Sequence, residues 1–369
     1  MRAADTFRKF ETCITKLPKA KQVKTDSYNK GTLYPIISQE EKLISGYCDD
    51  ESMLFGIEKP VVIFGDHTRV LKYVDFDFIV GADGVKILSP IEDIDAKFLF
   101  YYLTWYNIPN LGYSRHYKLL KKIDVPIPKK ETQYSIVKEL DQINALIEIK
   151  EKQLRELEEL EQTIFHEMFG DPIDNEKGWD VDKLGSVCDV RDGTHDSPKY
   201  LQQSNYMLIT SKNISSGIID FSNVNYISEE DYNSINKRSK VDDGDLIMPM
   251  VGTIGNPVIA KVDDSIHYAI KNVALIKFNQ TSSLNNKFLH SLMNSYSFTN
   301  YMLSKNKGGT QKFVALGTIR SLPIIVPPLE MQNDYREKAK LVESQKGKLI
   351  ETLNGLQELL ASRMQYWFD

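Results

Sequence analysis

The chain has 369 residues, of which 41% are hydrophobic and 26% are charged, and its formal net charge is −5. This length allows two sizeable domains at roughly 100–200 residues each. No apolar run reaches the roughly 18–20 residues of a membrane helix, and three scattered cysteines predict reduced thiols in a cytoplasmic protein. The negative charge argues against a general DNA coat but leaves local DNA contacts open.

The first part of the chain, residues 1–128, is predicted to be a mixed domain rich in strands. Short apolar runs at 34–37, 61–64, 76–80 and 85–88 are bounded by Gly, Asp and Pro, as strands are. A helix is predicted over 97–103. The residues Pro126 and Pro128 then interrupt regular structure before the next helix begins.

A long helix is predicted from about Glu131 to Met168, within a helical spacer at 129–170. Its length would be about 57 Å at 1.5 Å per residue. Apolar side chains recur at three- and four-residue steps, which is the pattern of a coiled-coil stripe. The stripe comprises Ile136, Leu140, Ile143, Ile147, Leu154, Leu157 and Ile164.

The remaining chain repeats this plan, with a second domain at 171–326 and a second helical spacer at 327–369. Strands are predicted at 206–209, 245–248, 258–260 and 273–276, and a helix over 287–293. The last helix carries its own apolar stripe, formed by Val342, Leu349, Leu353, Leu356, Leu360 and Met364.

The two halves are related by an internal repeat with a constant separation of 199 positions. Pro128 corresponds to Pro327, Gln133 to Gln332 and Phe169 to Phe368, without a gap. The sequence therefore predicts an α+β, pseudo-twofold protein whose two long helices pack as an antiparallel coiled coil, with the domains at its opposite ends. In an alternative interpretation, each helix packs only on its own domain.

No catalytic, metal or cofactor motif is found. Residues 252–257 lack the G-x-G-x-x-G spacing and lead into a proline, and residues 166–169 lack the second histidine of a zinc-protease motif. We therefore expect a protein that is not an enzyme and that binds no cofactor of its own.

Several motifs occur in the same order in both halves. The second half opens with Gly-Trp-Asp-Val-Asp-Lys-Leu-Gly at 178–185, continues through Gly-Thr-His at 193–195 and reaches Leu-Pro-Ile-Ile-Val-Pro-Pro-Leu-Glu-Met-Gln at 322–332. The first half has a related proline–glutamine junction at 128–133. Together these motifs resemble the specificity (S) subunit of type I restriction–modification enzymes. The first half lacks the Gly-Trp opening, and residues 10–14 are interpreted as its remnant.

The resemblance implies a non-catalytic subunit that recognises double-stranded DNA. Its two target-recognition domains would each read one part of a bipartite site, and the helices would set the gap between them. Two methyltransferase subunits would dock on the helical region and supply S-adenosylmethionine, and restriction (translocase) subunits would complete the complex. A related type II recognition subunit, a coiled-coil scaffold without DNA specificity and a catalytic DNA-modifying enzyme remain alternatives.

Candidate DNA-binding residues are those that can donate to base edges or phosphates from loops. In the first half they are Ser38, Gln39, Tyr113, Ser114, Arg115, His116, Tyr117 and Lys118. In the second half they are Thr194, His195, Lys199, Tyr200, Lys212, Asn213, Lys307, Gly308, Gly309, Thr310, Gln311 and Lys312. Each of these loops could instead be an ordinary solvated loop, and Asn213 could be a turn residue.

Overall fold

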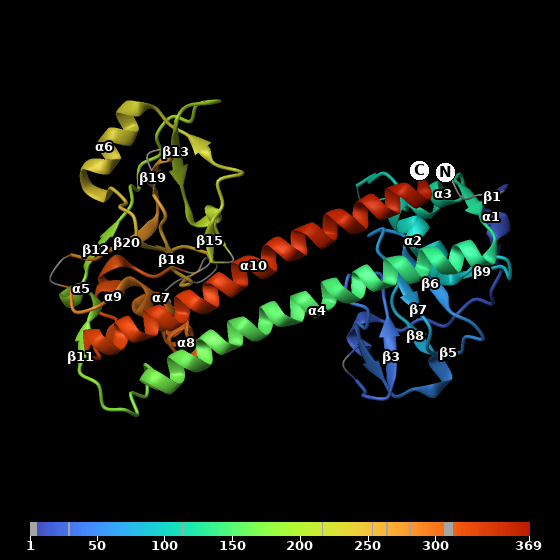
Figure 1. Ribbon diagram of the computed structural model, residues 1–369, viewed down its shortest axis with the longest axis horizontal. Coiled ribbons are helices and arrows are strands. Elements are labelled where there is room, and N and C mark those ends of the chain that lie inside the picture. Colours follow the sequence, from blue (N-terminus) through green and yellow to red (C-terminus); the bar gives the residue numbers. More distant parts are fainter. Residues whose placement is uncertain are drawn as a thin grey trace. The chain divides into compact units, whose positions relative to one another are not determined.

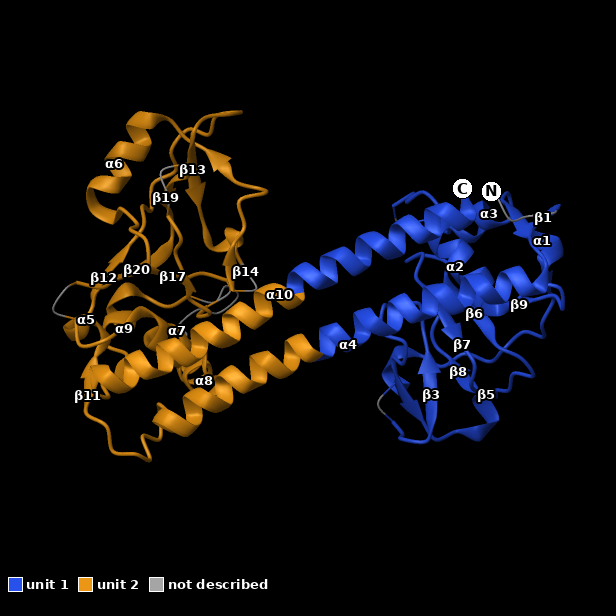
Figure 2. Cartoon of the chain, in the orientation of Figure 1, with its two compact units in different colours: residues 1–152, 350–369 blue, residues 153–349 orange. Residues whose placement is uncertain are grey.

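The computed structural model describes residues 6–28, 30–112, 114–215, 217–252, 254–262, 265–279, 282–305 and 313–369 (Figure 1). The chain divides into two compact units (Figure 2). Unit 1 contains residues 1–152 and 350–369, and unit 2 contains residues 153–349. Within the described ranges, no helix is both long enough and apolar enough to cross a membrane.

Unit 1 is a mixed domain with two four-stranded sheets, in the orders β2-β9-β6-β7 and β4-β3-β8-β5, and a separate β1–β10 pair. Its strands are β1 (Thr6–Lys9), β2 (Ile14–Thr15), β3 (Tyr34–Ile37), β4 (Gly46–Cys48), β5 (Leu54–Phe55), β6 (Val61–Gly65), β7 (Leu71–Val74), β8 (Phe78–Val80), β9 (Val85–Pro90) and β10 (Asp124–Ile127). Its helices are α1 (Phe10–Cys13), η1 (Thr25–Ser27), η2 (Glu51–Met53), α2 (Ala96–Tyr106), α3 (Tyr117–Leu120) and the first part of α4 (Lys130–Phe169).

Unit 2 repeats the plan with sheets in the orders β12-β20-β17-β18 and β16-β13-β19, and with the pairs β11–β21 and β14–β15. Its strands are β11 (Val181–Lys183), β12 (Asp189–Asp192), β13 (Tyr206–Ile209), β14 (Ile214–Ser215), β15 (Ile218–Ile219), β16 (Asn225–Tyr226), β17 (Leu246–Pro249), β18 (Val258–Ile259), β19 (His267–Ile270), β20 (Val273–Lys277) and β21 (Pro323–Ile325). Its helices are α5 (Leu184–Val187), η3 (Ser211–Asn213), α6 (Glu229–Ser239), α7 (Asn286–Asn294), α8 (Tyr296–Ser304), α9 (Leu316–Arg320) and the first part of α10 (Leu329–Phe368).

The two units share a strand plan despite their different loops. In each unit an opening strand pairs antiparallel with the strand that leads into the long helix, as Lys9 with Asp124 and Lys183 with Pro323. The short helix that follows the opening strand starts at Phe10 in unit 1 and at Leu184 in unit 2, and both side chains are fully buried. Phe10 therefore occupies the place of Leu184, the leucine of the Gly-Trp-x-x-x-x-Leu-Gly opening.

The helices α4 and α10 pack together and antiparallel. In unit 1, Ile136 and Leu140 near the start of α4 share a core with Met364 and Phe368 near the end of α10. In unit 2 the order is reversed, because the end of α4 meets the start of α10. The interpretation in which each helix packs only on its own domain is therefore wrong.

The predicted apolar stripe lies on the inner side of both helices. Of the predicted side chains, Ile136, Leu140, Ile143, Ile147, Val342, Leu353 and Met364 are buried. The half-buried ones are Leu154, Leu157, Ile164, Leu349, Leu356 and Leu360. The closing aromatic residues of the repeat are buried at equivalent places, Phe169 in the core of unit 2 and Phe368 in the core of unit 1.

A buried glutamine fixes the first turn of each long helix to the preceding domain. Gln133 accepts a hydrogen bond from the Asp95 backbone N–H at 2.8 Å and donates to the carbonyls of Asp93 at 2.9 Å and Pro128 at 2.8 Å. Gln332 makes the same three bonds, to Asn285 at 2.9 Å, Ser283 at 2.8 Å and Pro327 at 2.7 Å. Asp95 and Asn285 are the N-caps of α2 and α7, so the repeated glutamine links two helix starts in each unit.

Candidate nucleic-acid interface

Three loops of unit 1 meet around Gln39, which follows β3. Its side-chain Oε1 accepts from the His67 backbone N–H at 3.2 Å, and its Nε2 donates to the Asp83 carbonyl at 3.1 Å. The Thr68 hydroxyl donates to the Gln39 carbonyl at 2.6 Å. Gln39 therefore ties together the loops that follow β3, β6 and β8, and its DNA contact stays a prediction.

The loop that carries Arg115 is fixed to this cluster by a buried histidine. His116 is fully buried, and its backbone N–H donates to the Asp66 carbonyl at 2.8 Å. Its Nε2 accepts from the Leu111 N–H at 3.0 Å, so Nδ1 carries the proton and donates to the Asp66 carbonyl at 3.0 Å. His116 therefore holds the loop and is not placed for the DNA contact that the sequence suggested.

For the neighbours of His116 the DNA contact stays a prediction. Arg115 and Lys118 are exposed, and Ser114 is half-buried, whereas Tyr113 lies outside the described residues. Tyr117 is half-buried, and the Nζ atoms of Lys86 and Lys121 each lie 5.7 Å from the centre of its ring. Lys121 is paired with Glu11 at 2.9 Å and Lys86 lies 3.8 Å from Asp66, so Arg115 and Lys118 are the cations of this part of unit 1 that a DNA contact would use.

Ser38 has a structural role in place of the predicted DNA contact. The residue is 3% exposed, and its hydroxyl lies 2.7 Å from the Ser45 hydroxyl. The Ser38 carbonyl accepts from the buried ammonium of Lys72 at 2.9 Å, and burial lowers the pKa of Lys72. Lys72 also donates to the carbonyls of Lys42 and Leu43, so it holds the loop after β3 in place.

A lysine-rich segment of unit 1 was not among the predicted DNA-binding residues. Lys16, Lys19, Lys21 and Lys24 are exposed between β2 and β3. The Val23 N–H donates to the Val80 carbonyl at 3.0 Å, which places Lys24 at the end of β8. The signal in the sequence is the density of positive charge, four lysines within residues 16–24.

The corresponding loop of unit 2 follows β12 and contains Thr194 and His195. The Thr194 N–H donates to the Ile270 carbonyl at 3.0 Å, so His195 occupies the position that Lys24 has in unit 1. Gly193 is required here, because a Cβ atom would lie 2.4 Å from the Ile270 carbonyl oxygen. His195 is exposed, and so are Lys199 and Tyr200.

Asn213 is the turn residue that the alternative interpretation allowed. It is 6% exposed, and its Oδ1 accepts from the Thr210 N–H at 3.0 Å. Its Nδ2 donates to the Asn223 carbonyl at 2.9 Å, which closes the turn around η3. These bonds replace the predicted DNA contact, whereas the neighbouring Lys212 is exposed and stays a prediction.

The predicted glycine-rich loop of unit 2, which comprises Lys307, Gly308, Gly309, Thr310, Gln311 and Lys312, lies outside the described residues. The chain that follows it is described: the Val314 N–H donates to the Met250 carbonyl at 3.0 Å, just after β17. In unit 1 the His116 N–H makes the matching bond to the Asp66 carbonyl, just after β6. The two loops therefore rejoin their domains at equivalent points.

Comparison with known proteins identifies the family. The family model of the type I restriction modification DNA specificity domain matches residues 14–159 and, a second time, residues 176–345. The chain belongs to this family. It is a type I specificity subunit, which is a non-catalytic class of subunit, and it has two DNA specificity domains.

Relatives of this specificity subunit include named proteins and solved structures. A putative type I restriction enzyme specificity subunit of Haemophilus influenzae is 25% identical over 291 residues, which cover 74% of this chain and 72% of that protein. The putative MjaX specificity subunit of Methanocaldococcus jannaschii is 33% identical over 125 residues, or 32% of this chain and 28% of that protein. The crystal structure of the S subunit from M. genitalium shares the fold, with a TM-score of 0.59 at 14% identity, covering 99% of this chain and 96% of that one.

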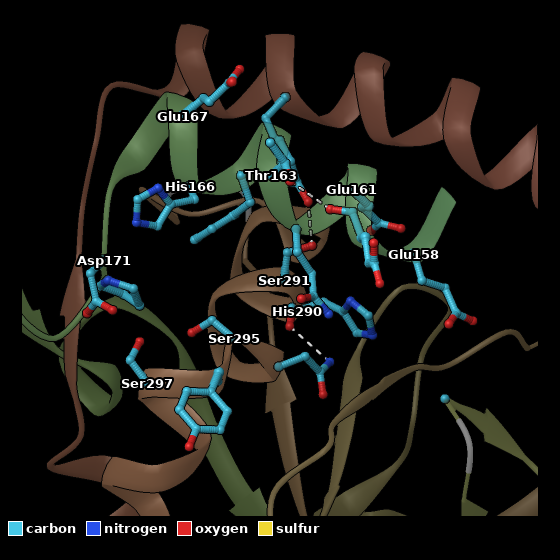
Figure 3. Close-up of a pocket in the computed structure, with 18 of the residues that line it drawn as sticks. Glu158, Glu161, Thr163, His166, Glu167, Asp171, His290, Ser291, Ser295 and Ser297 are labelled. Atoms are coloured by element: carbon cyan, nitrogen blue, oxygen red, sulfur yellow. Dashed lines mark hydrogen bonds between the residues drawn. The ribbon is translucent and has the colours of Figure 1, made fainter. Parts of the chain in front are cut away.

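A groove in unit 2 of this specificity subunit has a different chemistry from the loops. It has a volume of about 1210 Å³ and lies beside the last turns of α4 and the helices α7 and α8 (Figure 3). Acidic side chains line it, among them Glu158, Glu161, Glu167 and Asp171. An acidic wall repels phosphate, so we do not assign this groove to DNA.

Neighbouring residues shift the pKa values of two titratable groups in the groove. Burial alone raises the pKa of Glu161, but Lys287 at 2.6 Å and Lys346 at 2.7 Å lower it more. Burial and the Lys287 charge lower the pKa of His290 to about 4, so this imidazole is neutral at pH 7. Across the part of the chain that the structure describes, no group of three or more His, Cys, Asp or Glu side chains is arranged to hold a metal ion.

Proposed function

We propose that this subunit reads a bipartite double-stranded DNA site, with one specificity domain on each part of the site. The observation that carries the proposal is the repetition of one arrangement. In both units an exposed basic residue, Lys24 or His195, follows the residue whose N–H donates to the end of β8 or β19. A second loop rejoins each domain next to β6 or β17. Two readers of the same design suit a target read in two parts.

Local charge supports a DNA contact despite the net charge of −5. Much of the negative charge lies on the long helix α4, where five carboxylates are exposed: Glu148, Glu151, Glu156, Glu158 and Glu159. The lysines of residues 16–24, Arg115 and Lys118 lie on loops of unit 1 instead. Binding should therefore depend on a few loop contacts and on ionic strength.

We further propose that two methyltransferase subunits dock on the paired helices and that restriction (translocase) subunits join them. The chemistry of adenine methylation, and the S-adenosylmethionine that it needs, would belong to the methyltransferase subunits. The helices would set the number of base pairs between the two parts of the site. The domain divisions that fit this assignment are recognition domains at 1–128 and 171–326 and spacers at 129–170 and 327–369.

The test is methylation mapping of DNA from cells that express this subunit with its methyltransferase. A bipartite methylated adenine motif that disappears when the subunit is deleted is the expected result. Methylation without sequence preference would favour a scaffold role, and DNA methylation by the subunit alone would identify an enzyme. Either outcome would overturn the proposal.

A substitution then assigns the first domain to one part of the site. Arg115→Ala should relax the base preference in one part only, by about 1–3 kcal/mol, because an arginine that contacts a guanine discriminates by that amount. Arg8→Ala, which removes an exposed arginine paired with Asp93 in the same unit, is the matched control. If both variants methylate the same sites as the wild type, the assignment of Arg115 is wrong.

A further inference from the structure

Helix α6 distinguishes the second domain from the first. It lies between β16 and β17, where unit 1 has only η2 and β5 between β4 and β6. The Ser228 hydroxyl caps its start by accepting from the Asp231 N–H at 3.1 Å. Lys237 and Arg238 lie in its last turn, where the negative end of the helix dipole favours cations.

The last turn of α6 is fixed to the sheet. Arg191 of β12 donates from Nη1 to the Arg238 carbonyl at 2.9 Å, and Lys277 of β20 donates to the Lys240 carbonyl at 3.0 Å. These bonds satisfy carbonyls that a helix end otherwise leaves without a partner. The position of the Arg238 backbone is therefore set by two strands of one sheet.

A buried carboxylate holds two exposed cations beside this turn. The Asp192 side chain is 8% exposed, and its two oxygens bind different partners. One accepts from the Arg238 guanidinium, whose side chain is 66% exposed. The other accepts from Nε2 of His195 at 2.8 Å, and that imidazole is 61% exposed. We call His195 and Arg238 the aspartate-held pair.

The imidazole of His195 is a charge carrier rather than a reader. Its Nδ1 lies 2.8 Å from the Asn272 side-chain oxygen, so both ring nitrogens face acceptors and the protonated imidazole can donate to both. The hydrogen bonds to Asn272 and Asp192 raise the pKa of His195, whereas burial and the charge of Arg238 lower it by less. Those neighbours come from β12, α6 and the β19–β20 turn, and the protonated trio has a net positive charge.

Arg238 keeps donors for a ligand. Its Nη2 binds Asp192, and among the described residues no partner is recorded for its Nε or Nη1. A guanidinium with a fixed orientation and free donors matches two kinds of acceptor on DNA, the oxygens of a phosphate and the O6/N7 edge of guanine.

We infer that Arg238 contacts the second part of the DNA site, as a donor to a phosphate or a guanine edge, with His195 adding charge and Asp192 acting as the positioning residue. The inference rests on the proposed function. It explains why the buried Asp192 stands at the end of β12, directly before the loop with Gly193 and Thr194. It also gives α6 a role that has no counterpart in the first domain.

The experiment uses the complex of this subunit with its methyltransferase and fluorescently labelled duplexes of the mapped site. Arg238→Ala should weaken binding about 5- to 150-fold, which corresponds to one good contact. The neighbouring Lys237→Ala is the matched control, because Lys237 is exposed on the same turn and lies outside the aspartate-held pair. If the two variants bind DNA equally well, the inference is wrong. If the wild-type complex shows no sequence-dependent binding, the proposed function fails instead.

Two further arms identify the acceptor. A phosphate contact predicts that Arg238→Ala weakens binding to all duplexes alike and lowers the salt slope by about 0.9. A guanine contact predicts relaxed preference at one base pair of the second part only. Arg238→Lys should rescue a phosphate contact more than a guanine contact, since lysine lacks the planar fork of donors that a guanidinium presents to O6 and N7.

The pH dependence of DNA affinity distinguishes a role of Asp192 in positioning His195 and Arg238 from a merely structural role. Wild-type affinity should fall as the pH rises through the raised pKa of His195, because the imidazole then loses its charge. His195→Ala should remove this dependence, and Asp192→Asn should move it to lower pH as well as weaken binding. An Asp192→Asn complex that keeps wild-type affinity and an unchanged pH profile would refute the positioning role.

Discussion

Replacing Gln133 by leucine should loosen the joint between the first domain and α4, at nearly constant side-chain volume. The bond from Nε2 to the Pro128 carbonyl is buried, so losing it costs about 1–3 kcal/mol. The bonds with Asp95 and Asp93 are partly exposed, so water compensates in part and each loss costs about 0.5–1 kcal/mol. We therefore expect unit 1 to lose about 2–5 kcal/mol of unfolding free energy.

The measurement combines urea unfolding with hydrogen exchange followed by mass spectrometry. Exchange should rise at the starts of α2 and α4, which Gln133 joins. Gln332→Leu should have the same effect in unit 2, at the starts of α7 and α10. Gln357→Leu, an exposed substitution on α10, should stay within about 0.5 kcal/mol of the wild type. If Gln133→Leu behaves like Gln357→Leu, the glutamine joint contributes nothing and the reasoning fails.

Two substitutions and one insertion test the paired helices. Glu161 has its pKa held low by Lys287 and Lys346, so its contribution to unit 2 should be present above about pH 4–5 and be lost as the pH falls through its folded pKa. Glu161→Gln should flatten that acid limb in urea titrations, and an equal offset at every pH would contradict this. Phe368→Ala removes a ring 5.7 Å from those of Phe98 and Tyr102 and should cost unit 1 about 3–5 kcal/mol in urea unfolding, whereas a loss under about 1 kcal/mol would show that the end of α10 is not part of that core. Inserting four residues after Leu154 adds about 6 Å of helix and should change the spacing of the methylated site but not its bases, so an unchanged spacing would refute the role of the helices as a spacer.

The arrangement of two domains and two long helices could be predicted because the sequence contains an internal repeat with a constant offset. The prolines, Gln133 and Gln332, and the closing phenylalanines lie at matching positions, and the strands at 34–37, 61–65 and 206–209 have strong apolar runs. The loop residues were less predictable. Ser38, His116 and Asn213 have polar side chains that suit DNA, but the Ser38 hydroxyl lies against the Ser45 hydroxyl, and His116 and Asn213 bind backbone groups of their own domain. Polarity alone does not distinguish a buried turn residue from an exposed reader.

Helix α6 and the cations beside it were not predicted for a related reason. The segment from Glu229 to Ser239 is polar on most sides, so it has no strong apolar stripe. Its functional residue, Arg238, is held by Asp192, which is 46 positions earlier in the chain. A contact of this kind depends on the register of β12 beside β20, which a single sequence does not state.

Unit 1 is built from two separate segments of the chain, and this has a consequence for the folding of newly synthesised protein. The core of unit 1 includes Met364 and Phe368, so unit 1 is completed only by residues that are translated after the whole of unit 2. At about 5–20 residues per second, the first 152 residues wait on the order of 10–40 s for their closing helix. Unit 2 is continuous in the chain, so it can finish first, and we expect the order of maturation to run opposite to the order of synthesis.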